Sequence, residues 1–295
     1  MTRQQEGLRP TASALADALR EHGYAIARGI LPQATIERLD ADLAEAFDAT
    51  PFGQGSFYGT RTKRFGRLLT RSRMAEQLVL QPDILGAAEA LLLPHCEVIQ
   101  LNVAQAIAIH PGSLQQMPHR DQDMWRIVPG SAEYLLNVIW PFTRFTPENG
   151  ATLVWPDTHG ANATATELQR DPVVAEMMPG DALLFLGSTV HGAGPNRTPT
   201  EIRRGCVIGY SLGWLKPYEN QLLAYPPAVA RGFAPELAAL VGYRQHRPNL
   251  GNYEGQCPSI LLAGDPDRPI GAIDALRDDQ VELVDAFAEA QRRMP

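Results

Sequence analysis

The sequence predicts a mainly β protein, a sandwich or jelly roll, with helices covering the core from its N-terminal side. Beyond Pro94 the chain contains short runs rich in β-branched and aromatic residues, separated by Pro, Gly, Asn and Asp. No helical pattern lies between these runs, which disfavours a parallel α/β sheet. We therefore expect a single domain with a mainly helical region over 1–94, the β core over 95–215, and loops followed by a terminal helix over 216–295.

The N-terminal region shows apolar residues at helical spacing. Leu15, Ala18 and Leu19, followed by Gly23 as a C-cap, predict a helix over 12–22. The segment YAIARG that follows has the composition of a short strand. A second helix is predicted over 32–49 and further helical pattern lies around 74–92. The second helix would present one apolar stripe formed by Ile36, Leu39, Leu43 and Phe47.

Five runs supply the predicted strands of the core. They read EVIQLNVAQAIAI, EYLLNVIWPFTRF, ATLVWP, DALLFLGSTV and GCVIGYSLGWL. Residues 217–275 are rich in Pro, Gly and Arg and have weak periodicity, whereas Asp279–Arg293 have the pattern of a terminal helix. The segments 50–72 and 217–265 are long and poorly patterned, which is typical both of lids over a jelly-roll mouth and of plain surface loops.

Charge and cysteine content narrow the class of partner. The net charge is -7 and the sequence pI about 5.5, so the chain has no basic field to attract nucleic acid or an anionic membrane. Cys96, Cys206 and Cys257 form no CxxC pair and no disulfide framework, which fits a reducing compartment. The N-terminus lacks the apolar core of a signal peptide, and no run reaches the roughly 20 apolar residues that span a bilayer. We expect a cytoplasmic protein.

Two histidines and one aspartate form the candidate site. His119 and Asp121 lie two residues apart, and on an extended strand this spacing sends both side chains to one face. His191 ends an apolar run 70 residues later. Two imidazoles and one carboxylate leave open positions on a metal, an arrangement typical of non-haem iron(II) oxygenases. An HxD pair also arises by chance, and a lone histidine at a strand end is often only a hydrogen-bonded structural residue.

Three longer blocks around these residues carry a family resemblance. PGSLQQMPHRDQDMW, FTPENGATLVWPDTHG and MPGDALLFLGSTVHGAGPNRTPTEIRRG resemble the phytanoyl-CoA dioxygenase family of iron(II)/2-oxoglutarate-dependent oxygenases, in the family's order over roughly 95–215. A weaker match is GTRTKRFGRLLTRS. The resemblance implies a double-stranded β-helix (jelly-roll, cupin-like) core. It also implies that His119, Asp121 and His191 bind Fe(II) and that 2-oxoglutarate and O₂ are co-substrates.

The resemblance also implies a set of 2-oxoglutarate contacts. Arg203 matches the arginine that clamps the distal carboxylate, a task that suits a planar guanidinium. Arg204 would face the other side of the strand, and the spacing from the distal histidine leaves the choice between the two arginines open. Thr152 and Gln116 match a hydroxyl and an amide that assist, and Arg64, with Arg61 near it, would cover the co-substrate. Without the resemblance, Thr152 would be interpreted as an ordinary strand threonine, Gln116 as a loop glutamine, and Arg61 and Arg64 as part of a solvated basic turn.

The substrate is the least determined part of the prediction. Trp125, Asn137 and Trp140 are candidates to line its pocket, although tryptophans near strands are as often core residues. Scattered basic residues disfavour a phosphate-rich acyl-CoA, so we expect a small, rather apolar metabolite of a biosynthetic pathway. Hydroxylation with release of succinate and CO₂ is the default outcome. Desaturation, rearrangement and endoperoxide formation stay open, as does the oligomeric state.

Two other classes of function remain possible at this point. A jelly-roll protein can bind a metabolite without turnover, and the same three ligands can serve a metal-dependent hydrolase or isomerase that needs no O₂. The intact carboxylate at Asp121 favours oxygenation over halogenation, because halogenases of this broad class have a small residue there.

Overall fold

Two antiparallel sheets form the core of the computed structural model, which describes residues 10–126, 128, 130, 132–164, 168, 170–264 and 269–294. Residues 1–9 of the predicted N-terminal region lie outside the described residues. The larger sheet has the strand order β1-β7-β4-β9-β3-β2 and the smaller one the order β6-β5-β8. The strands of the larger sheet are β1 (Tyr24–Ala27), β2 (Thr62–Phe65), β3 (Ile99–Ile109), β4 (Leu135–Pro141), β7 (Ala182–Leu186) and β9 (Arg203–Leu212). Those of the smaller sheet are β5 (Thr152–Val154), β6 (Val173–Val174) and β8 (His191–Ala193).

Alternation along the central strands separates two sides of the larger sheet. On β4, Leu136, Val138 and Trp140 join the main hydrophobic core, whereas Leu135, Asn137 and Ile139 line a pocket. On β3, a register shift between Leu101 and Val103 adds Asn102 to the residues that face the pocket. The pocket is also lined by Thr152, His191 and Ala193 of the smaller sheet, so it lies between the two sheets.

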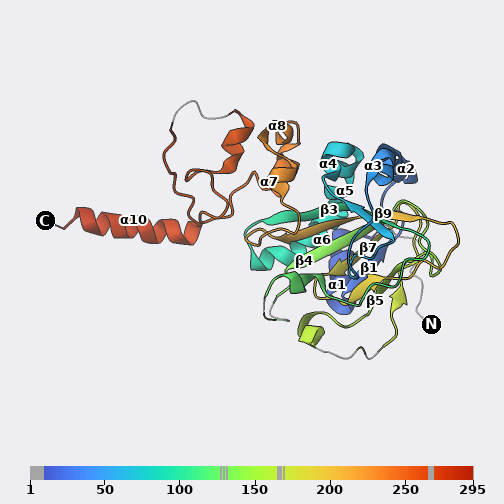
Figure 1. Cartoon of the computed structure of the whole chain (residues 1–295). Helices are drawn as coiled ribbons and strands as arrows, with labels where there is room; N and C mark the ends of the chain where they lie inside the picture. The colour runs from blue at the N-terminus through green and yellow to red at the C-terminus, as the bar shows by residue number, and fades with distance from the viewer. Residues whose placement is uncertain are drawn as a thin grey trace.

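Helices cover the opposite side of the larger sheet, as the sequence predicts (Figure 1). They are α1 (Ala12–His22), α2 (Gln33–Asp42), α3 (Ala44–Ala49), α4 (Leu68–Arg71), α5 (Met74–Val79) and α6 (Pro82–Leu92). The predicted limits of α1 are confirmed. The Thr11 side chain accepts a hydrogen bond from the backbone N–H of Ala14, and Gly23 ends the helix at a φ of 78°.

The other two predicted helices are each divided. The apolar stripe of 32–49 continues across both halves, but Leu43 separates α2 from α3. The pattern over 74–92 is interrupted between α5 and α6, where Gln81 is the N-cap and Pro82 the first helical residue. Proline disfavours the helical conformation in the residue before it, which explains this second break.

Short helices lie before, within and after the β core. They are η1 (Leu93–His95) before it, η2 (Asp121–Met124) and η3 (Gly160–Thr164) within it, and α7 (Gln221–Ala224), α8 (Pro227–Ala230), α9 (Pro235–Leu240) and η4 (Pro258–Leu262) after it. The predicted terminal helix is present as α10 (Asp278–Arg292) and projects away from the rest of the molecule in Figure 1. Among the described helices, none has the length and apolar character needed to span a bilayer. The single-domain organisation stays a prediction.

Candidate metal centre and its pocket

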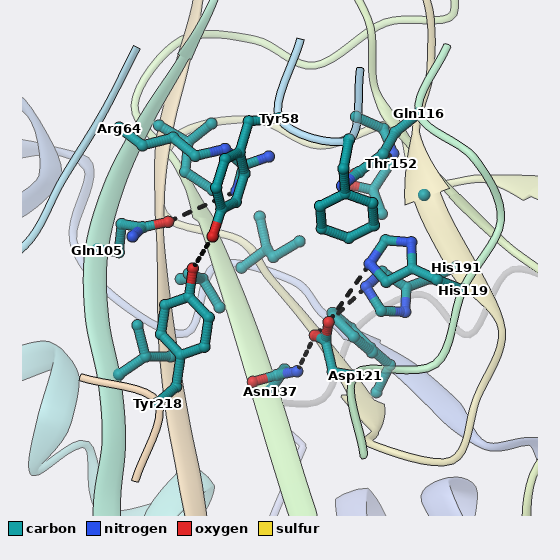
Figure 2. Close-up of a pocket in the computed structure, with 18 of the residues that line it drawn as sticks. Tyr58, Arg64, Gln105, Gln116, His119, Asp121, Asn137, Thr152, His191 and Tyr218 are labelled. Atoms are coloured by element: carbon teal, nitrogen blue, oxygen red, sulfur yellow. Dashed lines mark hydrogen bonds and ion pairs between the residues drawn. The ribbon is translucent and has the colours of Figure 1, made fainter. Parts of the chain in front are cut away.

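Backbone pairing brings the two histidines together. His119 and His191 form an antiparallel bridge in which each backbone N–H donates to the other's carbonyl at 3.0 Å. Asp121 follows at the first residue of η2. Nε2 of His119 lies 3.3 Å from one carboxylate oxygen of Asp121, and Nε2 of His191 lies 3.4 Å from the other (Figure 2). Three ligand atoms within 4.8 Å of one another thus come from positions far apart in the chain.

Hydrogen bonds fix the orientation of each candidate ligand. Nδ1 of His119 lies 2.8 Å from the carbonyl oxygen of Met117, and Nδ1 of His191 lies 3.2 Å from that of Thr189. A carbonyl only accepts, so each Nδ1 carries the proton and each Nε2 presents its lone pair to the site. This is how imidazoles that bind metals in proteins are usually held.

Asn137 orients the carboxylate. Its side-chain amide donates to Oδ2 of Asp121 at 2.6 Å, and the side chain is 2% exposed. Gly209 on the neighbouring strand leaves the room it needs, because a Cβ there would lie 2.7 Å from Oδ1 of Asn137. The sequence predicted Asn137 as a substrate contact. It does line the pocket, but the contact it makes is with Asp121.

The charges of the three groups favour binding of a divalent cation. Burial opposes ionisation of Asp121, but His191, His119 and Arg64 outweigh it, and the pKa of the carboxyl is lowered. Burial lowers the pKa of His191. Burial also acts to lower the pKa of His119, but the hydrogen bond and the charge of Asp121, together with the Met117 carbonyl, outweigh it and the pKa is raised. The donor set is two imidazole nitrogens and one carboxylate, and among the described residues no fourth His, Cys, Asp or Glu joins the group. These residues fit a non-haem iron(II) site with open positions.

Arg203 carries a positive charge into the pocket beside this group. The side chain is buried, its guanidinium lies 3.7 Å from the centre of the Phe145 ring, and Nη2 donates to the Thr152 hydroxyl at 3.0 Å. Nε has no hydrogen-bond partner, and none of the described carboxylates forms an ion pair with this arginine. Burial lowers the pKa of Arg203 to about 9, with a smaller contribution from Arg64. A buried cation without a counter-ion is costly, which indicates that an anion belongs here.

The neighbouring Arg204 faces the other way. Its Nη2 donates to Oδ2 of Asp40 at 2.5 Å and its guanidinium lies over the Phe47 ring, among the covering helices. The alternation of β9 therefore places Arg203, and not Arg204, in the pocket.

The remaining predicted co-substrate residues also line the pocket. Thr152 accepts from Arg203, and the Gln116 side chain accepts from the backbone N–H of Ala193 at 3.3 Å. Arg64 enters from β2, with its guanidinium over the Tyr58 ring at 5.2 Å and its Nη1 3.5 Å from the Gln105 side-chain oxygen. Burial lowers the pKa of Arg64, and its Nε has no hydrogen-bond partner. Arg61 is exposed and donates to the Pro111 carbonyl outside this pocket.

Neither tryptophan lines the pocket, so these two predictions are wrong. Trp140 is fully buried in the core behind the sheet, three residues along β4 from Asn137 and hence on the opposite face. Trp125 packs against that core, and its indole N–H donates to the Lys216 carbonyl at 2.9 Å. Met124, the residue before it, lines the pocket instead.

The sequence prediction missed the wall that faces the metal ligands. Tyr58 and Tyr218 come from different loops, and their hydroxyls lie 2.6 Å apart (Figure 2). Asn102 and Gln105 of β3 complete the polar part of this wall. Polar residues inside the apolar run EVIQLNVAQAIAI were the available signal for the two amides. The loop tyrosines had none.

Comparisons with known proteins agree with this geometry. The sequence model described as Phytanoyl-CoA dioxygenase (PhyH) matches residues 19–205. The dioxygenase FrzG of Cladobotryum sp is 30% identical over 266 residues, 80% of this chain and 86% of the relative. The dioxygenase aneA of Aspergillus aculeatus is 32% identical over 224 residues, 71% of this chain and 75% of the relative.

Solved structures share the fold. The non-heme alpha ketoglutarate dependent epimerase SnoN from nogalamycin biosynthesis superposes with a TM-score of 0.58 at 20% identity, covering 70% of this chain and 86% of that one. HygX of Streptomyces hygroscopicus gives a TM-score of 0.54 at 12% identity, covering 70% of this chain and 89% of that one. The predicted jelly-roll core is confirmed. The chain belongs to the phytanoyl-CoA dioxygenase (PhyH) family, and it is a non-haem iron(II)- and 2-oxoglutarate-dependent dioxygenase.

Proposed function

We propose that this dioxygenase oxidises a small, largely apolar metabolite, by default through hydroxylation, and releases succinate and CO₂. One observation carries the proposal. The His119, Asp121 and His191 ligand atoms converge in a pocket that also holds the buried guanidinium of Arg203, which has no counter-ion among the described residues. A metal and a small anion are the two groups that this arrangement fits.

The three ligands would hold Fe(II). Bound iron supplies the activation of O₂ and the oxidising power for breaking a substrate C–H bond. The chain's part is to keep both Nε2 lone pairs aimed at one point through the carbonyls of Met117 and Thr189. Asn137 holds one oxygen of Asp121, which leaves the other free to bind the metal.

Two guanidinium groups in the pocket would attract the dianion 2-oxoglutarate. Arg203 and the Thr152 hydroxyl would bind the distal carboxylate, because a buried guanidinium can make two charge-assisted hydrogen bonds to it. Arg64 and Gln116 also line the pocket and would supply further contacts to the co-substrate. Asp121 is the only carboxylate among the described lining residues, so nothing else in the pocket competes for these cations.

The rest of the pocket suits an apolar substrate with few polar groups. Its lining is mainly aliphatic, contributed by Val103, Met124, Leu135, Ile139 and Val207. The polar groups opposite the metal ligands are neutral, namely Tyr58, Tyr218, Asn102 and Gln105. No cations beyond the two arginines lie among the described lining residues, which makes a CoA ester with its phosphates a poor fit. SnoN, which shares the fold, is an epimerase from nogalamycin biosynthesis, and this supports a biosynthetic substrate for this chain as well.

Turnover tests the proposal. The purified protein, supplied with Fe(II), ascorbate and 2-oxoglutarate in air, should release succinate, and a panel of neutral polycyclic or prenylated compounds should raise that rate. His119→Ala should abolish the release while leaving the melting temperature of the iron-free protein nearly unchanged. Product formation from any such compound in the absence of O₂ would favour the hydrolase or isomerase alternative. Iron binding without any succinate formation would favour a binding protein.

A further inference from the structure

A second cavity meets the active pocket beside the co-substrate contacts proposed above. It has a volume of about 520 Å³ and lies between two loops, residues 55–62 and 112–117. This size is within the range of roughly 300–1,000 Å³ that is usual for small-molecule sites. The side cavity shares five lining residues with the active pocket, namely Phe57, Tyr58, Arg64, Gln116 and Ala193.

Two of the shared residues adjoin the proposed binding site of the distal carboxylate. The Gln116 backbone N–H donates to the Ala193 carbonyl at 2.9 Å, and the Ala193 backbone N–H donates to the Gln116 side-chain oxygen at 3.3 Å. Ala193 pairs across the smaller sheet with Thr152, whose hydroxyl accepts from Arg203. The side cavity therefore opens into the active pocket next to Thr152 and Arg203.

The substrate side of the pocket reaches the surface elsewhere. Asn102, Met124 and Tyr218 line the active pocket but not the side cavity. Met124 and Tyr218 are 43% and 45% exposed, so this side has an opening of its own. The active pocket thus has two connections to solvent, one next to the co-substrate contacts and one next to the neutral polar wall.

Two arginines line the side cavity. Arg64 is shared with the active pocket, whereas Arg61 is exposed. Arg61 also borders the second loop, because a Cβ on Gly112 would lie 4.0 Å from its Nε. No carboxylate occurs among the described residues that line this cavity. Since the net charge of the chain is -7, the protein as a whole repels a dianion, and cations at one opening attract it there.

We propose that 2-oxoglutarate enters and succinate leaves through the side cavity, whereas the organic substrate uses the opening beside Met124 and Tyr218. This route depends on the proposed function, because it requires the co-substrate to bind at Arg203 and Arg64. Both 2-oxoglutarate and succinate are small dianions, so two arginines along one path attract either of them. Separate routes let succinate be exchanged for a new 2-oxoglutarate while an organic molecule still occupies the other side of the pocket.

Obstruction of the side cavity tests the route. Ser56 and Gln115 are exposed and line the cavity from its two loops. In the iron-loaded, oxygen-free protein, Ser56→Trp and Gln115→Trp should each slow the association of 2-oxoglutarate at least about ten-fold, as measured by stopped-flow absorbance. The Kd from equilibrium dialysis should stay within about two-fold, because an obstruction slows entry and exit alike, whereas loss of a binding contact speeds dissociation. Gln54→Trp is the matched control and should bind at the wild-type rate, since Gln54 is exposed on the same loop but lines neither cavity.

The charge of Arg61 provides an independent test. Arg61→Glu should lower the association rate about three- to ten-fold at low ionic strength, and about 0.5 M salt should largely remove the difference from the wild type. Arg73→Glu changes the net charge equally at an exposed residue that lines neither cavity, and its association rate should stay within about two-fold of the wild type. Circular dichroism and melting temperature should show that all variants are folded.

The route is overturned if 2-oxoglutarate associates with Ser56→Trp and Gln115→Trp as fast as with the wild type. It is also overturned if Met124→Trp, which obstructs the other opening, is the variant that slows association. A wild type that binds no 2-oxoglutarate in the presence of iron would overturn the proposed function together with the route. Unchanged rates in a protein that does bind 2-oxoglutarate overturn the route alone.

Discussion

Asn137 of β4 donates a hydrogen bond from its side-chain amide to Oδ2 of Asp121, the first residue of η2, at a distance of 2.6 Å. The bond ties the only carboxylate of the candidate metal centre to the rigid middle of the larger sheet. It also occupies one of the two carboxylate oxygens, which favours binding of the metal through the other and keeps coordination positions open for co-substrates.

Asn137→Ala should therefore weaken iron binding by about ten- to a hundred-fold, the usual effect of losing such a supporting bond. Anaerobic titration with Fe(II) measures this. Asn102→Ala is the matched control, because Asn102 lines the same pocket but accepts its hydrogen bond from the backbone of Tyr218. Equal iron affinity in the two variants would show that Asn137 does not support Asp121.

Arg203→Ala should strongly weaken 2-oxoglutarate binding while iron still binds. Truncating one partner of a buried charge pair costs about 2–5 kcal/mol, a loss of roughly thirty-fold to several thousand-fold in affinity. Arg203→Lys keeps the charge but loses the planar guanidinium that can donate two parallel hydrogen bonds to a carboxylate. An intermediate loss of 2-oxoglutarate affinity is therefore expected. Arg204→Ala should retain full 2-oxoglutarate affinity and lose only stability, since Arg204 pairs with Asp40 on the other side of the strand. If Arg204→Ala is the variant that loses the co-substrate, the assignment is reversed.

Iron binding should weaken on acidification, and His119 should be the first ligand protonated. Burial lowers its pKa, but the Asp121 carboxylate outweighs this and raises the pKa above the ordinary 6.5. Burial lowers the pKa of His191, so His191 stays neutral at lower pH. Protons compete with the metal for the His119 imidazole, so the apparent iron affinity should rise as the pH increases from about 5.5 through 6.5 and level off only above the raised pKa of His119. A series of titrations across that range measures it, and an affinity that does not change between its ends would contradict the account.

Trp140→Phe should reduce stability without affecting the pocket. The indole is fully buried in the core behind the sheet, so the smaller ring should lower the free energy of unfolding by about 1–3 kcal/mol. Denaturant unfolding measures this loss. The affinity for 2-oxoglutarate and the rate of succinate release should stay within about two-fold of the wild type. A selective change in substrate preference with unchanged stability would instead show that Trp140 contacts the substrate.

Local rules allowed the prediction of the metal ligands. His119 and Asp121 are two residues apart, and the family blocks identify His191 as the third ligand. The sequence predicted His191 at the end of an apolar strand, whereas it is the first residue of β8, and a single antiparallel pairing with His119 brings all three ligands together. Strand alternation required that one of Arg203 and Arg204 face inward, but no local rule says which side of a strand faces a pocket. The same alternation already argued against Asn137 and Trp140 sharing one face, since they are three residues apart.

The parts that could not be predicted depend on tertiary contacts. Tyr58 and Tyr218 lie on loops without periodicity, and they meet only because the folded core brings those loops together. Asn102 stands out as a polar residue in an apolar run, but it faces the pocket because of the register shift in β3, and the run does not show where that shift falls. The helix breaks differ in this respect. The one before Pro82 follows from proline geometry, whereas the one at Leu43 lies within an unbroken apolar stripe.

Co-binding of iron and 2-oxoglutarate under anaerobic conditions tests the central claim most directly. Equilibrium dialysis of the wild type should give one Fe(II) per chain and one 2-oxoglutarate that is retained tightly only when iron is present. His191→Ala should lose both, and Arg203→Ala should lose only the 2-oxoglutarate. The account is contradicted if the wild type with bound iron retains no 2-oxoglutarate, or if iron binds to His191→Ala as well as it does to the wild type.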